Sequence, residues 1–343
     1  LKMSISIIQS ILFFVSLKII LIYFYSKLAS RIGLVDIPNE RKNHIGNIPL
    51  VGGICIYSCL ILYFIFFDTS LNHKIIFVSS MVIFILGLYD DLYNLGVAER
   101  IFFQTLICLV IVGFGIRIFD LGTFTIGTNA DLLINLGGFG IILTVLCIIG
   151  YSNAINFSDG LDGLAGGYLL NVFLSIILFS YYFGKNENLE IIFLIVVLLI
   201  VFLFSNFGFI LPKIFLGDNG STSIGFLASC YLIYFTLPEN RHFHPVLTLW
   251  AAPMPIFDFI TIFFYRIINK RSPSNIASYI CDGCLGDIST NGNITLQETL
   301  VTFPISSPLI KLVIRPKNIP NGDTHAIISS KKRAETSLLI ENK

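Results

Sequence analysis

Charged residues are scarce in this sequence: they make up 13% of its 343 residues, whereas soluble globular proteins carry about 25%. So few charges cannot coat a water-soluble domain of this size. A cationic excess is also missing, because 22 basic residues nearly cancel 21 acidic ones, which argues against a nucleic-acid partner. Only 7 cysteines occur in a long, apolar chain, which excludes a small secreted scaffold held by disulfides.

Apolar residues are abundant instead, at 55% of the chain, and the mean hydropathy is +0.83. A bilayer core of about 30 Å needs roughly 20 apolar residues per helix. We therefore predict an all-α fold, a polytopic bundle of about nine transmembrane helices. The predicted spans cover approximately residues 4–26, 48–67, 73–89, 101–118, 138–157, 164–183, 189–206, 222–237 and 245–266.

Basic residues in the connecting segments predict the orientation of the spans. Nine of them follow odd-numbered spans and five lie on the opposite side, so we expect the N-terminus outside the cell and residues 267–343 in the cytoplasm. Acidic residues gather on the same inner side, five of them at span ends. The eight acidic residues on the inner side are Asp36, Glu40, Asp90, Asp91, Glu99, Asp159, Asp162 and Asp218. A carboxylate near hydrocarbon is costly and is usually retained for a function, so we predict a site on the cytoplasmic face.

Two neighbouring carboxylates, Asp90 and Asp91, close the third predicted span. Adjacent carboxylates repel each other and gain from a divalent cation. Mg²⁺, bound through oxygen ligands and substrate phosphates, is the natural partner. The pair is a common dipeptide, so it becomes specific only beside other motifs.

Polar residues also end the fifth predicted span. Asn153, Asn156 and Asp159 are spaced by three and share one face of a helix. Asp162 and several glycines follow, and glycine lets backbone amides approach a ligand closely. A polar helix end with a glycine loop is the alternative, but these groups exceed what capping requires.

The eighth predicted span is preceded by Gly217-Asp218-Asn-Gly-Ser221. A helix N-terminus of this kind suits phosphate or a metal–phosphate complex. Alternatively, Asp218 or Ser221 caps the orphan amides of the helix. The sequence alone leaves both interpretations open.

A basic loop with Arg41, Lys42 and His44 leads into the second predicted span. Cationic groups at the inner surface can hold an anionic lipid headgroup, whereas ordinary positive-inside topology explains the charges without the flanking prolines and glycines. Together, the four motifs indicate phosphoryl transfer at a membrane surface.

These motifs, in this order and at these spacings, resemble the polyprenyl-phosphate N-acetylhexosamine-1-phosphate transferases of glycosyltransferase family 4. The stretch Asp36-Ile-Pro-Asn-Glu-Arg-Lys-Asn-His-Ile-Gly-Asn-Ile-Pro-Leu-Val-Gly-Gly53 is more similar to the WecA type than to the MraY type. The similarity extends from about residue 15 to about residue 273. It implies transfer of N-acetylglucosamine-1-phosphate from a UDP-sugar to undecaprenyl phosphate in the bacterial inner membrane, with release of UMP. The product would begin a cell-surface polysaccharide such as O-antigen.

The resemblance also implies residue roles. Asp218 and Asn156 would bind Mg²⁺, for which Mn²⁺ can substitute, while Asp90, with Asp91 beside it, would face the lipid phosphate. Asp159 and Asp162 would position the nucleotide and diphosphate. The remaining residues would bind substrate: Asn153, Asn206, Phe215, Arg41, Lys42, His44 and Arg100. A homodimer is compatible with this assignment.

The chain departs from the family pattern in two places. Where relatives carry a lysine near the start of the fourth span, this chain has Ala98, and Arg100 lies about 200° further around the helix. In the family, which usually has ten or eleven spans, the chain continues after the position of Ser272-Pro273 into a histidine-rich cytoplasmic loop and then into further spans. Here residues 273–343 form a tail of unrecognised, divergent or frame-altered sequence after a transferase domain at 1–272. A zinc site at Cys281 and Cys284 has weak support, because no histidine lies nearby.

Three alternatives remain open from the sequence. An inactive or truncated member of the same family would explain both departures. A UbiA-type prenyltransferase also has aspartate-rich Mg²⁺ sites, but its motif needs a carboxylate where this chain has Asn94. A transporter would place its polar groups near the midplane rather than on one face.

Overall fold

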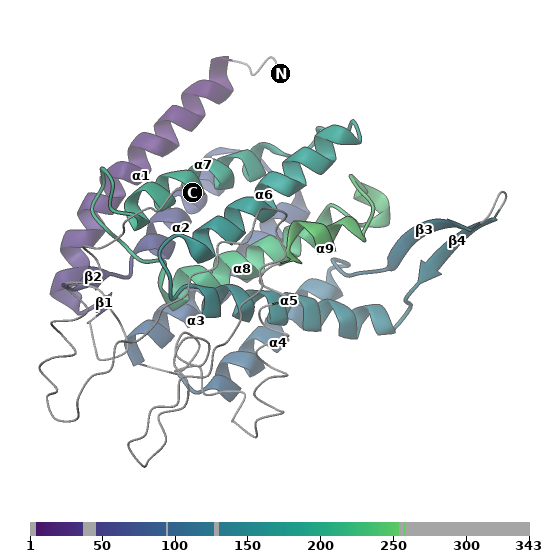
Figure 1. The fold of residues 1–343 in the computed structure, drawn as a ribbon, viewed down its shortest axis with the longest axis horizontal. Helices are drawn as coiled ribbons and strands as arrows, with labels where there is room; N and C mark the ends of the chain where they lie inside the picture. The colour runs from purple at the N-terminus through teal and green to yellow at the C-terminus, as the bar shows by residue number, and fades with distance from the viewer. Residues whose placement is uncertain (1–4, 37–45, 94, 127–129, 254–256, 258–343) are drawn as a thin grey trace, which may run out of the picture. The chain divides into compact units, whose positions relative to one another are not determined.

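The computed structural model describes residues 5–36, 46–93, 95–126, 130–253 and 257, and the described part of the chain is mostly helical. The all-α, polytopic membrane class predicted from the sequence is confirmed (Figure 1). The helices are α1 (Ile5–Ile32), α2 (Gly52–Phe66), α3 (Leu71–Tyr93), α4 (Val97–Gly113), α5 (Phe139–Ser158), α6 (Leu164–Tyr182), α7 (Glu190–Asn206), α8 (Gly217–Tyr234), the 3₁₀ turn η1 (Pro238–Asn240) and α9 (Leu247–Ala251).

Four of the described helices are long and apolar enough to cross a membrane, namely α1, α3, α5 and α6. The apolar helices α2 and α7 are shorter, at 15 and 17 residues. Eight of the nine predicted spans coincide with a described helix, whereas most of the ninth lies outside the described residues. The tail at 273–343, with Cys281 and Cys284, also lies outside them.

Helix α8 occupies the centre of the helical packing, and every residue in it except Asp218 is buried. It packs against α3 and α5, and further against α2 and α6 (Figure 1). Small residues line it, and in membranes such residues let helix backbones approach closely. A Cβ atom on Gly87 of α3 would lie 2.6 Å from Cα of Asn219, so only glycine allows this approach.

Two small antiparallel sheets join the helices, and neither was predicted from the sequence. β1 (Val35–Asp36) pairs with β2 (Ile48–Pro49), and β3 (Asp120–Ile126) pairs with β4 (Ala130–Asn135). Asp120 at the base of the longer hairpin receives two hydrogen bonds of 2.7 Å from Arg241, which follows η1. This ion pair fastens the hairpin to the segment after α8.

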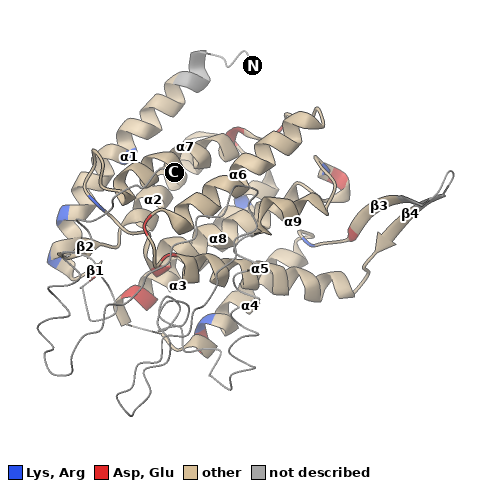
Figure 2. Ribbon diagram, in the orientation of Figure 1, with Lys and Arg blue, Asp and Glu red and all other residues tan. Residues whose placement is uncertain are grey.

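Charged side chains are concentrated at helix ends, while the helix interiors are nearly free of them in the described part of the chain (Figure 2). Lys18 is an exception, because it lies within α1 and is fully buried. Its ammonium group donates to the carbonyl of Leu198 in α7 and lies 5.8 Å from the centroid of the Phe202 ring. These contacts tie α1 to α7.

Candidate active site

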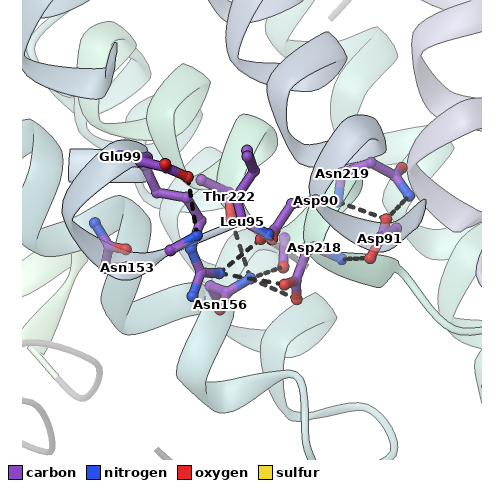
Figure 3. A network of polar contacts seen from close by, with 12 residues as sticks. Asp90, Asp91, Leu95, Glu99, Asn153, Asn156, Asp218, Asn219 and Thr222 are labelled. Atoms are coloured by element: carbon purple, nitrogen blue, oxygen red, sulfur yellow. Dashed lines mark hydrogen bonds and ion pairs between the residues drawn. The ribbon is translucent and has the colours of Figure 1, made fainter. Parts of the chain in front are cut away.

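The site is built around the N-terminus of α8, which is capped from another helix. Leu216 at the N-cap position provides no capping side chain. Asp91 near the end of α3 does so instead: its carboxylate accepts hydrogen bonds from the backbone nitrogens of Asp218 at 2.9 Å and Asn219 at 3.0 Å. The Asn219 side chain adds a third bond of 2.5 Å (Figure 3). Gly87 lies one turn earlier on the same face of α3 and permits the close contact.

This contact resolves the question that the sequence left open about the start of α8. A side chain does cap the helix, but it is Asp91 and not Asp218 or Ser221. The Asp218 side chain is therefore not needed as the cap, and it is 42% exposed. The helix also begins five residues before the predicted span. Its polar first turn has no capping side chain of its own, and Asp91 supplies the hydrogen-bond acceptors for the free backbone amides.

Arg100 joins Asp90 to Asp218. Its Nη1 atom donates to Asp90 Oδ2 at 2.7 Å and to Asp218 Oδ2 at 3.3 Å. Asp90 is 5% exposed, and its other carboxylate oxygen accepts the backbone N–H of Leu95 at 2.7 Å. Two carboxylates from α3 and α8 thus share one nitrogen of a guanidinium from α4.

Arg100 reaches this place because of where α4 begins. The helix starts at Val97, and Glu99 accepts a 3.1 Å hydrogen bond from the Gly96 amide in its first turn. The angle of about 200° between Ala98 and Arg100 on a helical wheel describes only the direction of Cβ. A long arginine side chain on the first turn can reach back to α3, while Ala98 is exposed. Arg100 thus places a positive charge beside Asp90, although Ala98 replaces the lysine of the family pattern.

Asn156 near the end of α5 also contacts Asp218. Its Nδ2 atom lies 3.0 Å from Asp218 Oδ1, 2.9 Å from Ser221 Oγ and 3.0 Å from Thr222 Oγ1. In this orientation the amide holds the Asp218 carboxylate in place. A metal-ligand role, which stays a prediction, would use the carbonyl oxygen Oδ1 of the same amide.

Asn153 is one turn earlier on α5 and faces α4 instead of Asp218. Its Nδ2 atom donates to Gln104 Oε1 and to the carbonyl of Ile149, both at 2.8 Å. Gln104, 3% exposed, was not singled out from the sequence, although a polar side chain inside a predicted span was a usable signal. The substrate-binding role of Asn153 stays a prediction, and its contacts connect α4 to α5.

Asp159 directly follows α5 and lies near the carboxylates of Asp218 and Asp91. Burial raises the pKa of the Asp159 carboxyl well above its usual value, and the negative charges of Asp218 and Asp91 raise this pKa further. A hydrogen bond from the backbone of Gly217 opposes the shift. Burial and the neighbouring carboxylates therefore disfavour the charged form of Asp159.

Asp162 is paired with Lys213, whose Nζ lies 2.5 Å from Asp162 Oδ2. The same ammonium lies 5.5 Å from the centroid of the Phe215 ring, within the range of a cation–π contact. Asp162 and Phe215, predicted to act on the nucleotide, are thus connected through a lysine at one end of α8.

Asn206 at the end of α7 is buried and uses both ends of its amide inside the protein. Its Oδ1 accepts the backbone N–H of Gly163 at 2.6 Å, and its Nδ2 donates to the carbonyl of Ile214 at 2.9 Å. These bonds hold the segment before Phe215 against the glycine loop after α5. The structure thus gives Asn206 a positioning contact, while its predicted substrate contact stays a prediction.

The predicted basic residues Arg41, Lys42 and His44 lie outside the described residues. The strands flanking them are described, and β2 is fastened to the segment before α8. The backbone nitrogen of Phe215 donates to Pro49 at 2.9 Å, and that of Gly52 donates to Phe215 at 2.9 Å.

The carboxylates near Arg100 fit a Mg²⁺ site in which the protein supplies only some of the ligands. Among the described residues, no group of three or more histidine, cysteine, aspartate or glutamate side chains has a geometry that would hold a metal ion. However, Mg²⁺ in phosphoryl-transfer enzymes is bound by one or two carboxylates together with substrate phosphates. Asp90 and Asp218 converge on a single cationic nitrogen, so they match this second arrangement.

Comparison with known proteins identifies the family. A family model described as "Glycosyl transferase family 4" matches residues 73–236, which include Asp90, Arg100, Asn156 and Asp218. The undecaprenyl-phosphate alpha-N-acetylglucosaminyl 1-phosphate transferase of Escherichia coli (strain K12) is 32% identical over 74% of this chain and 69% of its own length. The chain belongs to glycosyl transferase family 4.

Further relatives with the same printed name agree with this assignment. The protein of Yersinia pestis is 32% identical over 72% of this chain and 68% of its own length. That of Haemophilus influenzae is 31% identical over 72% of this chain and 70% of its own length. This family-4 chain is therefore an enzyme, a membrane-bound transferase, and the UbiA-type prenyltransferase and the transporter lose their place as alternatives.

Proposed function

We propose that this enzyme transfers N-acetylhexosamine-1-phosphate, with N-acetylglucosamine as the sugar, from a UDP-sugar to undecaprenyl phosphate and releases UMP. The relatives' printed names support the acceptor and the sugar. The observation that carries the proposal in this chain is the convergence of Asp90, Asn156 and Asp218 (Figure 3). Arg100 from a fourth helix binds both of these aspartates.

In the proposed reaction, an oxygen of the lipid phosphate attacks the phosphorus that carries the sugar. The bond from that phosphorus to the bridging oxygen breaks, and UMP leaves with the electron pair. A phosphate monoester is already an anion at neutral pH, so it needs little help from a base. Catalysis of this kind depends mainly on alignment and charge neutralisation.

The described side chains have separate tasks in this reaction. Asp218, with Asn156 or Asp90 as a second ligand, would hold Mg²⁺, and the ion would supply positive charge beside the diphosphate. Asn156 orients Asp218 through their 3.0 Å contact, and Asp91 fixes the helix end from which Asp218 projects. Arg100 provides positive charge at the same point. Lys213 and Phe215 form the side to which the nucleotide binds.

We further propose that the site faces the cytoplasm of a bacterial inner membrane, where UDP-sugars are available. The product would begin a cell-surface polysaccharide such as O-antigen. The lipid phosphate would arrive from the bilayer and would meet charged residues at the helix ends, which Figure 2 shows in red and blue.

A radiolabelled UMP exchange assay tests the proposal. Membranes containing the chain are incubated with labelled UMP, unlabelled UDP-N-acetylglucosamine and undecaprenyl phosphate. Label should enter the UDP-sugar, and only when the lipid is present. Absence of exchange in folded protein would support the inactive family member instead. Replacing the sugar by N-acetylgalactosamine in a parallel reaction determines the preferred hexosamine.

A further inference from the structure

Asp90 and Asp218 present an electrostatic problem that the described site solves with Arg100. Asp90 is 5% exposed, and its Oδ2 shares a single guanidinium nitrogen with Oδ2 of Asp218, at 2.7 and 3.3 Å. Two carboxylates this close repel each other unless a cation lies between them. Arg100 is that cation, and it lies where an ion bound by both carboxylates would also have to lie.

We propose that Arg100 is a resident counter-cation that holds Asp90 and Asp218 together before substrate binds and that a divalent metal ion displaces it. This inference rests on the proposed function, since it takes Asp218 as a metal ligand. It makes Arg100 a positioning residue in the empty enzyme and a phosphate-binding residue once it is released.

The competition follows from the contacts. The Nη1 atom of Arg100 occupies the shared coordination side of both carboxylates, so a metal ion and the guanidinium cannot bind both oxygens at once. The metal ion must therefore replace two charge-assisted hydrogen bonds, which lowers its affinity in the absence of substrate. A metal ion that arrives with a diphosphate brings new acceptors for the guanidinium.

The surroundings of Arg100 permit the movement. Its side chain is 22% exposed and lies on the first turn of α4. A cavity large enough for about one water molecule adjoins it, lined by Ile83, Leu86, Gly87, Phe103, Gln104 and Thr222. Because the guanidinium is partly exposed, it can leave the carboxylates toward the open side of the site without unwinding of α4.

Mn²⁺ binding tests the inference without any enzymatic turnover. Purified full-length chain in detergent, free of nucleotide and lipid substrate, is titrated with Mn²⁺, and free ion is followed by electron paramagnetic resonance. Arg100→Gln should bind Mn²⁺ at least about fivefold more tightly than the wild-type protein, because the competing charge is gone. Equal or weaker affinity, or no Mn²⁺ binding by either protein, would overturn the inference.

Lys74→Gln is the matched control. It removes one positive charge from α3, at the end opposite Asp90, where Lys74 pairs with the exposed Asp68. The Mn²⁺ affinity of this variant should equal that of the wild type. A fivefold gain here would mean that net charge, and not the position of Arg100, determines the affinity, and this also overturns the inference.

Arg100→Lys, compared with Arg100→Gln, tests whether the positive charge at position 100 determines the Mn²⁺ affinity. The lysine retains the charge, so its Mn²⁺ affinity should stay near the wild-type value. In metal-free buffer, Arg100→Gln should melt at a lower temperature and gain more from added Mn²⁺ than the wild type does. A merely structural arginine would lower the melting temperature of both variants with no gain in Mn²⁺ affinity. UMP exchange tests the transfer reaction separately. The Mn²⁺ titration can therefore contradict the role of Arg100 while exchange still supports the transfer reaction, and the reverse is also possible.

Discussion

The carboxylate of Asp91 accepts a 2.9 Å hydrogen bond from the backbone nitrogen of Asp218, although 127 residues separate the two in sequence. The bond fixes the start of α8 against the end of α3. It also leaves the Asp218 side chain directed toward Arg100 and Asn156. Asp91 therefore holds the end of the helix, while Asp218 presents its carboxylate to Arg100 and Asn156.

Asp91→Ala should destabilise the protein. The substitution removes the acceptors for two backbone amides of α8, and loss of such a cap costs about 0.5–2 kcal/mol. We expect a lower melting temperature in detergent. We also expect reduced turnover, because the helix end that carries Asp218 is no longer held in place. A melting temperature equal to that of the wild type would show that the cap is not needed.

Gly87→Ala should disturb the same contact from the other side. Its Cβ would lie 2.6 Å from Cα of Asn219 and 2.8 Å from the carbonyl oxygen of Asp218, so α3 and α8 must separate. Overpacking of this kind costs about 1–3 kcal/mol. Gly150→Ala on α5 is the control, because a methyl group at that position would meet nothing within 4 Å. Similar melting temperatures for the two variants would contradict the close approach.

Asp218→Asn should lower turnover about a hundredfold or more, the scale on which one charge-stabilising group acts in catalysis. The variant keeps the shape of the side chain and the backbone amide that Asp91 binds. Asp68→Asn removes a carboxylate that is 98% exposed, and its turnover should match the wild type. Initial rates of lipid-linked product formation compare them, and equal losses in both would refute a chemical role for Asp218.

Removal of divalent metal should abolish turnover. The basis is the convergence of Asp90 and Asp218, whose donor set is completed only by substrate phosphates. Excess EDTA should stop the reaction, and Mg²⁺ or Mn²⁺ should restore it. Full turnover in chelated enzyme would exclude the metal role.

Much of the architecture could be predicted from the sequence because apolar length alone determines which segments can span a bilayer. The polar ends of α3, α5 and α8 were predicted to share one face, and Asp90, Asn156 and Asp218 do converge there. The β3–β4 hairpin was missed, although Asp120–Ile126 alternates in a strand-like pattern that a search for helices passes over.

The contacts of Arg100 could not be predicted, because they depend on where the first turn of α4 lies against α3. A helical wheel gives the direction of Cβ but not the reach of a long side chain. The capping by Asp91 was hidden for the same reason: hydrogen-bond partners on different helices are not encoded in spacing along one helix. Only Gly87, four residues before Asp91, marks the face of α3 that α8 approaches.

Transfer of the sugar together with its phosphate can be followed with a single isotopic label. The purified chain in nanodiscs is given undecaprenyl phosphate, Mg²⁺ and UDP-N-acetylglucosamine labelled with ³²P on the phosphorus next to the sugar. Label should move into an organic-extractable lipid product, and the released UMP should be unlabelled. Label that stays in the aqueous phase, as UDP or as intact donor, while the Asp218→Asn variant behaves identically, would contradict this transfer.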